Sequence, residues 1–391
     1  MPLQISYRPI SSSPNPTYNL IFFITGNPGL IDYYAPFLST LQTHLSSSSP
    51  SSSPSSSPSS PTYHIFGPSL AGFETLSDLA ANPSLPQKLY SLAEEIEYVK
   101  KSLIERIHDI PDGSTGYENV ILIGHSVGFY FTSLYCTSKL MKLMYQVGSY
   151  ILLETLTHLL RNPNLLTPPS TPTPNPPHLS GILLFPTITH ISASPSGLTL
   201  SPLLRLPQFP LLSSSLAKGL LSLSPNSVLN FLIPKVTGMT TPAANVTRNF
   251  LRSRQGVQQA LYLARDEMET IREDRWRDEI WGIESSSTET EMKTDGEIDG
   301  SGDNKTPPRL LFYFGRNDHW VAEHTRDALI AARGRNGVAM DPESVSFSGE
   351  RGNKPVMMID EEGIDHSFCV HSSEPMAEKV SRWVRAMVED V

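Results

Sequence analysis

A serine flanked by glycines, at the end of a buried strand, constrains the fold of this chain more than any other feature. It lies in the pentapeptide Gly124-His125-Ser126-Val127-Gly128. The apolar residues 120–123 predict a strand before it, and residues 127–140 have the spacing of a helix after it. Glycines permit a tight turn between the two elements, so we expect the Ser126 hydroxyl to project there, with a helix N-terminus behind it. The alternative is a chance match in an ordinary turn.

Strand and helix patterns alternate along the rest of the chain. Short apolar runs predict buried strands, and apolar residues at helical spacing predict helices. The expected strands are residues 18–24, 63–66, 120–123, 181–185 and 309–314, with a last one at 345–347 or 357–359. The expected helices are residues 31–45, 87–107, 127–140, 256–280 and 374–388. This alternation is typical of an α/β fold in which helices flank a mostly parallel central sheet.

Three segments interrupt that alternation. Residues 46–61 are almost only Ser and Pro, and residues 284–308 are acidic and rich in Ser, Thr and Gly, so both are expected to be disordered insertions. Residues 198–236 are rich in leucine but are broken by prolines. Because this leucine-rich segment falls between two expected strands, we expect residues 190–282 to form a lid inserted into a single domain of residues 1–391.

Charge and cysteine content exclude several classes of function. The formal net charge is -9, and no basic face suited to nucleic acid is expected. The two cysteines, Cys136 and Cys369, have no metal-ligand spacing and suit a reducing compartment. No basic region followed by an apolar run opens the chain, so no signal peptide is expected. We expect neither a metal nor another cofactor.

A base and an acid that could activate Ser126 follow it in the chain. A serine hydroxyl is a weak nucleophile and needs a base that an acid holds in place. In the α/β-hydrolase fold, which the Gly-x-Ser-x-Gly turn indicates, the order is serine, acid, histidine. Asp318 follows the strand expected at 309–314 and His366 precedes the last helix, so we expect these two residues to act with Ser126. The weaker alternatives are Asp360 and Asp365 as the acid, and His319, His324 and His371 as the base.

An oxyanion hole is expected from two backbone N–H groups. One should belong to Val127, the residue after the serine, and the other to Asn27 in the loop after the first buried strand. Gly26 and Gly29 in that loop would let the backbone approach a substrate, although a simple turn is the alternative. His125 would also line the substrate side, as a packing residue and not as the base.

Several segments together resemble the lipid droplet-associated hydrolase family. The resemblance rests on the serine pentapeptide and on Thr25-Gly26-Asn27-Pro28-Gly29, Tyr33-Tyr34, Phe37, Leu184-Phe185-Pro186-Thr187-Ile188, Ser194-Pro195-Ser196-Gly197, Asp318-His319-Trp320 and His366-Ser367-Phe368. It covers most of the chain apart from the Ser/Pro-rich and acidic segments. It implies a lipase-like fold, the same three catalytic residues, and sterol esters or acylglycerols as substrates. It also implies a location on lipid droplets and the endoplasmic reticulum.

The leucine-rich segment 198–236 has two interpretations. Prolines leave it no run of about 20 apolar residues, so we do not expect it to span a membrane. It could lie in a lipid surface as short helices, or it could pack on its own enzyme as a lid over an apolar pocket. The expected function is a lipid ester hydrolase working through an acyl-Ser126 intermediate. The alternatives are a soluble esterase or thioesterase, and a droplet-surface scaffold with little turnover.

Overall fold

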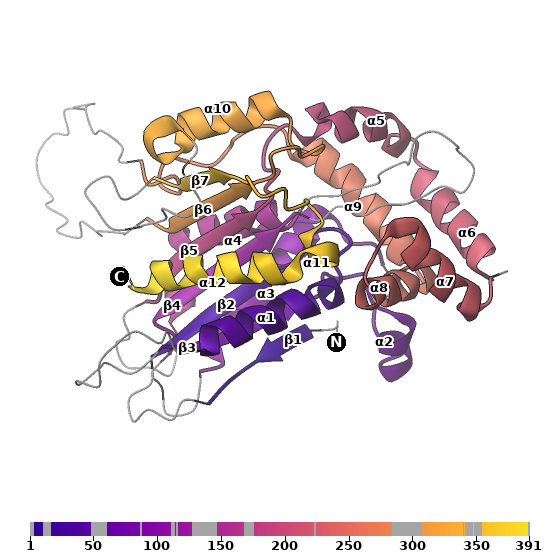
Figure 1. Ribbon diagram of the computed structural model, residues 1–391, viewed down its shortest axis with the longest axis horizontal. Helices are drawn as coiled ribbons and strands as arrows, with labels where there is room; N and C mark the ends of the chain where they lie inside the picture. Colours follow the sequence, from indigo (N-terminus) through magenta and orange to yellow (C-terminus); the bar gives the residue numbers. More distant parts are fainter. Residues whose placement is uncertain are drawn as a thin grey trace, which may run out of the picture.

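A central sheet of mostly parallel strands carries the fold (Figure 1). The computed structural model describes residues 4–10, 17–47, 61–86, 88–110, 114, 116–126, 147–167, 176–222, 224–283, 307–338, 340, 347 and 354–389. Within these residues the strands lie side by side in the order β1-β3-β2-β4-β5-β6-β7. Their bounds are β1 Gln4–Tyr7, β2 Tyr18–Ile24, β3 Thr62–Pro68, β4 Asn119–His125, β5 His178–Leu184, β6 Arg309–Phe314 and β7 Val356–Ile359.

The six strands β2 to β7 run parallel, and β1 pairs antiparallel with β3 at one edge. Every residue of β2 and of β4 is buried. Both strands therefore need cover on both faces, which explains the apolar runs at residues 20–24 and 120–123. The parallel arrangement confirms the α/β-hydrolase type of sheet that the sequence predicts.

Helices cover both faces of the sheet. On one face α1 (Ala35–Ser46) packs against α12 (Ser373–Glu389), and on the other α3 (Leu92–His108) packs against α4 (Gly148–Arg161) (Figure 1). The remaining short or peripheral helices are η1 Ile31–Tyr34, α2 Leu76–Ala81, η2 Pro163–Leu166, α10 Glu323–Arg333, η4 Arg335–Gly337 and α11 Phe368–His371.

A group of helices is inserted between β5 and β6, at one end of the molecule (Figure 1). It comprises η3 Ile191–Ala193, α5 Pro195–Leu204, α6 Phe209–Ser222, α7 Asn226–Thr237, α8 Thr241–Arg252 and α9 Gly256–Thr270. Prolines lie at the starts or ends of these helices more often than inside them, and this spacing divides the leucine-rich segment into short pieces. We refer to residues 191–270 as the helical insertion.

Several element boundaries differ from those expected, for local reasons. The helix expected from residue 87 begins at Leu92, because Ser91 and Glu94 form a capping box at that point. The helix expected from residue 256 ends at Thr270 and not at residue 280. The expected elements did not include β1, which is a half-exposed edge strand of four residues, or α4, although the apolar residues of α4 have helical spacing.

Three expectations concern residues outside those described. The helix expected at 127–140 lies wholly outside them. The same holds for nearly all of the two insertions expected at 46–61 and 284–308.

The last strand of the described sheet is β7, Val356–Ile359, which confirms the second of the two positions considered for it.

Candidate active site

The ends of three parallel strands bring together the three residues expected to be catalytic. Ser126 follows β4 directly, Asp318 lies in the turn after β6, and His366 lies in the loop after β7. Since all three strands run in the same direction, their carboxyl ends meet at one edge of the sheet. This edge is where open α/β sheets bind ligands.

His366 and Asp318 form a buried hydrogen-bonded pair. The Nδ1 atom of His366 lies 2.6 Å from Oδ2 of Asp318, and the two side chains are only 4% and 2% exposed. The other carboxylate oxygen of Asp318 accepts a hydrogen bond from the backbone N–H of Trp320, at 2.9 Å. Because an ionised carboxylate only accepts hydrogen bonds, Nδ1 of a neutral His366 carries the proton and Nε2 has a free lone pair.

Ser126 is completely buried, and His125 before it lies 3.0 Å, through Nε2, from the backbone oxygen of His366. The backbone N–H of Ser126 donates to the carbonyl oxygen of Leu184 at the end of β5, at 3.3 Å. Among the described residues, neither Ser126 Oγ nor His366 Nε2 has a hydrogen-bond partner, so the two atoms are not bonded to each other. Catalytic hydrogen bonds of this kind are often long without substrate.

The alternative acids and bases have other surroundings. Asp360 is buried, but its carboxylate accepts hydrogen bonds from Tyr313 Oη at 2.5 Å and from the backbone N–H groups of Gly363 and Ile364 at 2.7 and 2.8 Å. Asp360 therefore organises the loop that carries His366. The other candidates are exposed: Asp365, His319, His324 and His371.

His125 is a buried packing residue with two hydrogen bonds. Its Nδ1 lies 2.9 Å from Tyr34 Oη, and its Nε2 lies 3.0 Å from the backbone oxygen of His366. Its ring packs on Phe368 with the centroids 4.4 Å apart. Burial, followed by the nearby His366, lowers the pKa of His125 well below its usual value, so the ring is neutral.

The loop after β2 meets the helical insertion. The Asn27 side chain donates to the carbonyl oxygen of Ala260 at 2.9 Å and to Oε1 of the buried Glu267 at 3.1 Å, both on α9. These contacts engage the side-chain nitrogen of Asn27, whereas its Oδ1 has no hydrogen-bond partner among the described residues. Close packing explains why residue 29 is a glycine, because a Cβ there would lie 2.4 Å from Cβ of Leu70.

Gly26 and Val127 complete the set of expected site residues. The backbone N–H of Gly26 donates to Tyr34 Oη at 3.4 Å, so this glycine belongs to a hydrogen-bonded turn. Val127, expected to supply the first oxyanion donor, lies outside the described residues.

The helical insertion contacts the segment after β2 and the turn after β6. In addition to the contacts of Asn27 with α9, Tyr33 Oη bonds with Thr247 on α8 at 3.0 Å. The backbone N–H of Ser196, on α5, donates to the carbonyl oxygen of His319, the neighbour of Asp318, at 3.2 Å. No local sequence signal indicates these contacts, because each joins residues that are far apart in the chain.

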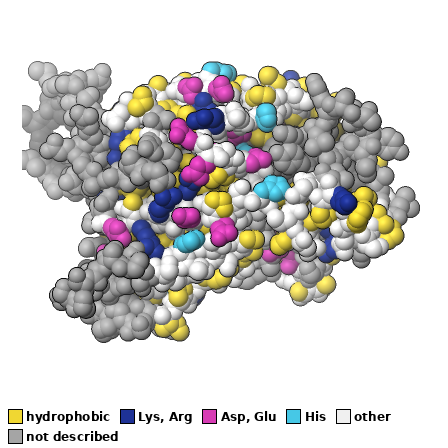
Figure 2. Space-filling model, viewed as in Figure 1, with side chains coloured by type: hydrophobic (Ala, Val, Ile, Leu, Met, Phe, Trp, Pro, Cys, Tyr) yellow, Lys and Arg dark blue, Asp and Glu magenta, His cyan; other side chains and the backbone are white. Residues whose placement is uncertain are grey.

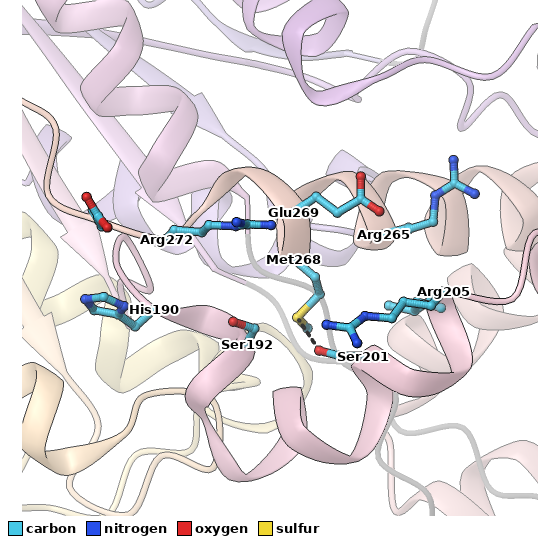
Figure 3. Close-up of a pocket in the computed structure, with 10 residues that line it drawn as sticks. His190, Ser192, Ser201, Arg205, Arg265, Met268, Glu269 and Arg272 are labelled. Carbon is cyan, nitrogen blue, oxygen red and sulfur yellow. Dashed lines mark hydrogen bonds between the residues drawn. The ribbon is translucent and has the colours of Figure 1, made fainter.

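A cavity of about 850 Å³ lies between α5 and α9, apart from the three strand-end residues (Figure 3). Its lining combines three arginines, Arg205, Arg265 and Arg272, with Glu269 and Glu273. Neither Ser126 nor His366 lines it. A charged cavity of this kind does not suit an apolar acyl chain, so we assign it no part in the chemistry at Ser126.

Comparison with known proteins identifies the family of this chain. The sequence profile described as lipid-droplet associated hydrolase matches residues 17–369. The chain belongs to the lipid droplet-associated hydrolase family. The mouse lipid droplet-associated hydrolase is 25% identical over 370 residues, covering 93% of this chain and 84% of the mouse protein. The chicken protein of the same name is 24% identical over 374 residues, covering 94% and 84%.

A solved structure confirms the fold independently. The peroxisomal α/β-hydrolase of Saccharomyces cerevisiae superimposes with a TM-score of 0.51 and 11% sequence identity, covering 99% of this chain and 82% of the yeast protein. At this level of identity the similarity establishes the fold alone. The protein is thus a hydrolase-family member with an α/β-hydrolase fold.

Proposed function

We propose that this family member is a serine ester hydrolase whose nucleophile is Ser126. The observation that carries the proposal is the buried His366, whose Nδ1 lies 2.6 Å from Oδ2 of Asp318. Among the described residues, its Nε2 and the Ser126 hydroxyl have no hydrogen-bond partner, and His125, next to Ser126 in the chain, contacts the backbone of His366. A triad is recognised by such geometry and roles and not by sequence position.

The reaction follows from this arrangement. His366 Nε2 takes the proton of the Ser126 hydroxyl as the serine oxygen attacks the ester carbonyl, and Asp318 stabilises the imidazolium that forms. Collapse of the tetrahedral intermediate breaks the carbonyl–alkoxy bond, and His366 gives its proton to the departing alcohol. Water then attacks the acyl-Ser126 ester with His366 again as base, and releases the carboxylic acid and the free serine.

Developing negative charge on the carbonyl oxygen requires hydrogen-bond donors. We propose the backbone N–H groups of Asn27 and Val127 for this role, each contributing about 3 kcal/mol in the transition state. Asn27 is supported by the hydrogen bonds of its side chain to Ala260 and Glu267 on α9, because they restrict the movement of its backbone.

A lipid ester is the proposed substrate, because the insertion exposes apolar side chains. Among the described residues, eight of the eleven exposed large hydrophobic side chains lie on or between α5, α6 and α7: Leu198, Leu206, Leu211, Leu212, Leu216, Val228, Phe231 and Leu232. In Figure 2 hydrophobic side chains gather at the right-hand end of the molecule, where Figure 1 has α6 and α7. Contiguous exposed apolar surface marks a binding face.

Charge on the same insertion favours a phospholipid surface as the place of action. Residues 191–270 contain seven basic residues and three acidic ones, although the whole chain has a net charge of -9. Their basic residues are Arg205, Lys218, Lys235, Arg248, Arg252, Arg254 and Arg265. Exposed leucines combined with cations suit a lipid surface with anionic headgroups. No helix in the described part of the chain is long and apolar enough to cross a membrane.

We therefore propose that the enzyme works on lipid droplets, and on the endoplasmic reticulum, with residues 190–282 acting both as lid and as lipid-docking surface. The contacts of α5, α8 and α9 with His319, Tyr33 and Asn27 support a lid, because they place these helices against segments that follow the ends of β2 and β6.

Labelling with a fluorophosphonate tests the activated serine directly. Wild type should react, whereas Ser126→Ala should not. Because a closed lid could block the probe, labelling is repeated with detergent micelles or lipid droplets present. Folded wild type that remains unlabelled under both conditions would contradict the proposal and favour a droplet scaffold.

A series of model esters then separates lipid hydrolysis from general esterase activity. Long acyl chains presented in micelles should be hydrolysed with higher kcat/KM than acetyl or butyryl esters. A preference for short soluble esters, or for acyl thioesters, would indicate the soluble esterase or thioesterase instead.

A further inference from the structure

A chain of buried hydrogen bonds joins the two loops that flank Ser126. The backbone N–H of Gly26 donates to Tyr34 Oη, 3.4 Å away. Tyr34 Oη lies 2.9 Å from Nδ1 of His125, and Nε2 of His125 lies 3.0 Å from the backbone oxygen of His366. The chain thus runs from the Gly-Asn-Pro-Gly loop, through the residue before the serine, to the backbone of the base.

Only one proton arrangement satisfies all of these atoms. The carbonyl oxygen of His366 can only accept, so Nε2 of His125 carries the proton and Nδ1 is the acceptor. The hydroxyl of Tyr34 must then donate to Nδ1 while it accepts from Gly26. Burial raises the pKa of Tyr34 well above its usual value, which keeps this hydroxyl protonated.

His366 is consequently held at two points. Asp318 holds its side chain through Nδ1, and His125 holds its backbone through the carbonyl oxygen. Aromatic rings fill the space around it: the Phe185 ring centroid lies 5.5 Å from that of His366, at a residue with the left-handed φ of 49°. A non-glycine residue in that conformation is strained and is retained where the surroundings require it.

We infer that His125 and Tyr34 are positioning residues that keep Nε2 of His366 and the backbone of the Asn27 loop aligned on Ser126. This inference rests on the proposed serine hydrolase activity. Neither residue needs to touch the substrate. Misplacement of a reacting group by about 1 Å can reduce a rate by about 100-fold, so a hydrogen bond that fixes the base loop affects kcat more than KM.

Tyr34→Phe removes one hydroxyl and retains the ring, and its matched control is Tyr117→Phe. Tyr117 is a buried tyrosine whose hydroxyl lies 3.1 Å from Nδ1 of another histidine, His64, and it precedes β4, whereas Ser126 follows that strand. On a soluble ester, Tyr34→Phe should lower kcat by roughly 10- to 100-fold and change KM by less than about 2-fold. Tyr117→Phe should keep kcat within about 2-fold of wild type, with a similar loss of Tm.

Two substitutions of His125 test the second hydrogen bond. In His125→Gln, the side-chain amide nitrogen reaches the position of Nε2 and can still donate to the carbonyl oxygen of His366. In His125→Asn, the side chain is shorter, and its amide nitrogen reaches only the position of Nδ1. We expect His125→Gln to retain at least about 5-fold more kcat and faster fluorophosphonate labelling than His125→Asn at equal Tm. This comparison stands even if Tyr34→Phe does not fold.

The outcomes separate this inference from the activity on which it rests. Suppose that wild type turns over. If both tyrosine variants then lose kcat in proportion to Tm, or if His125→Gln and His125→Asn are equally active, the positioning role is wrong. The proposed hydrolase activity would still stand. If folded wild type neither turns over nor labels, with or without micelles, both proposals are overturned.

Discussion

The Nδ1 atom of His366 lies 2.6 Å from the Oδ2 atom of Asp318, although the two residues follow different strands of the sheet. Both side chains are almost wholly buried. The pair meets only because β6 and β7 are parallel neighbours whose carboxyl ends lie at one edge. Asp318 is therefore the acid that meets His366, while the carboxylate of Asp360 accepts hydrogen bonds from its own loop.

Replacing Asp318 by Asn should abolish most turnover without unfolding the protein. The amide would present a donor to Nδ1 and favour the wrong tautomer of His366, which lowers kcat by roughly 10³- to 10⁴-fold in serine triads. Asp365→Asn, at an exposed neighbour of His366, is the control and should stay within about 2-fold of wild type. Steady-state hydrolysis of a soluble ester provides the measurement, and equal loss in both variants would argue against the assignment.

Asp360→Ala should lower stability and activity together. It leaves Tyr313 Oη and the N–H groups of Gly363 and Ile364 without their acceptor, at a cost of about 2–4 kcal/mol. Glu361→Ala is the control in the same loop, because its exposed ion pair with Arg316 contributes at most about 1 kcal/mol. Denaturant unfolding should separate the two variants. Similar stability of both would show that Asp360 does not organise the loop.

The buried Glu95 should make the stability of the folded protein fall as pH rises above 4.5. Burial is the largest cause that raises the pKa of Glu95 well above 4.5, and its Oε2 accepts from the backbone N–H of Ala71 at 3.0 Å. The unfolded chain releases this proton near pH 4.5 and the folded protein does not. Stability is therefore fully present below pH 4.5 and is lost as pH rises toward the folded pKa, by about 1.4 kcal/mol per pH unit.

Glu95→Gln removes this dependence and retains an acceptor for Ala71. Relative to wild type, the variant should gain stability as pH is raised from 4.5 to 8, with little difference between the two at pH 4. Unfolding of both proteins in urea across that range measures the difference. A constant offset at all pH values would mean that Glu95 titrates normally in the folded protein.

Binding to lipid should depend on the exposed leucines of α6. Replacing Leu211, Leu212 and Leu216 by Ser should weaken association with phospholipid-coated droplets, because each residue buries apolar area at the lipid surface. The control is Leu76→Ser with Val338→Ser, two exposed apolar residues outside the insertion. Droplet flotation measures the effect, and equal binding of both variants would place the docking surface elsewhere.

The charge of the insertion should make this binding depend on headgroups and salt. Lys218→Glu should weaken binding to vesicles containing anionic phospholipid by roughly tenfold, since each basic residue near such a surface contributes about 1 kcal/mol. Lys101→Glu makes the same charge change at an exposed site on α3 and should have little effect. Vesicle co-sedimentation at low and high salt tests this prediction. Binding that is independent of both headgroup charge and salt would show that only apolar contacts contribute.

Local patterns in the sequence predicted the fold and the order of the site residues. Uninterrupted apolar runs predicted β2 and β4, because a strand buried on both faces has no polar side to alternate with. The glycine-flanked Ser126 and the positions of Asp318 and His366 after later strands were also visible, since the carboxyl ends of parallel strands lie at one edge. The edge strand β1 escaped prediction because its alternation covers only four residues, whereas the spacing of apolar residues in α4 is helical and that helix was missed.

What the sequence by itself determined is the set of buried faces and strand ends, because burial follows the spacing of apolar residues along the chain. Only the tertiary structure decided which acid meets His366, that Asn27 is held by Glu267 on α9, and that Tyr34 and His125 join the two loops beside Ser126. Each of these contacts links residues distant in sequence. Its partner is selected by the packing of whole helices and strands, which no local pattern records.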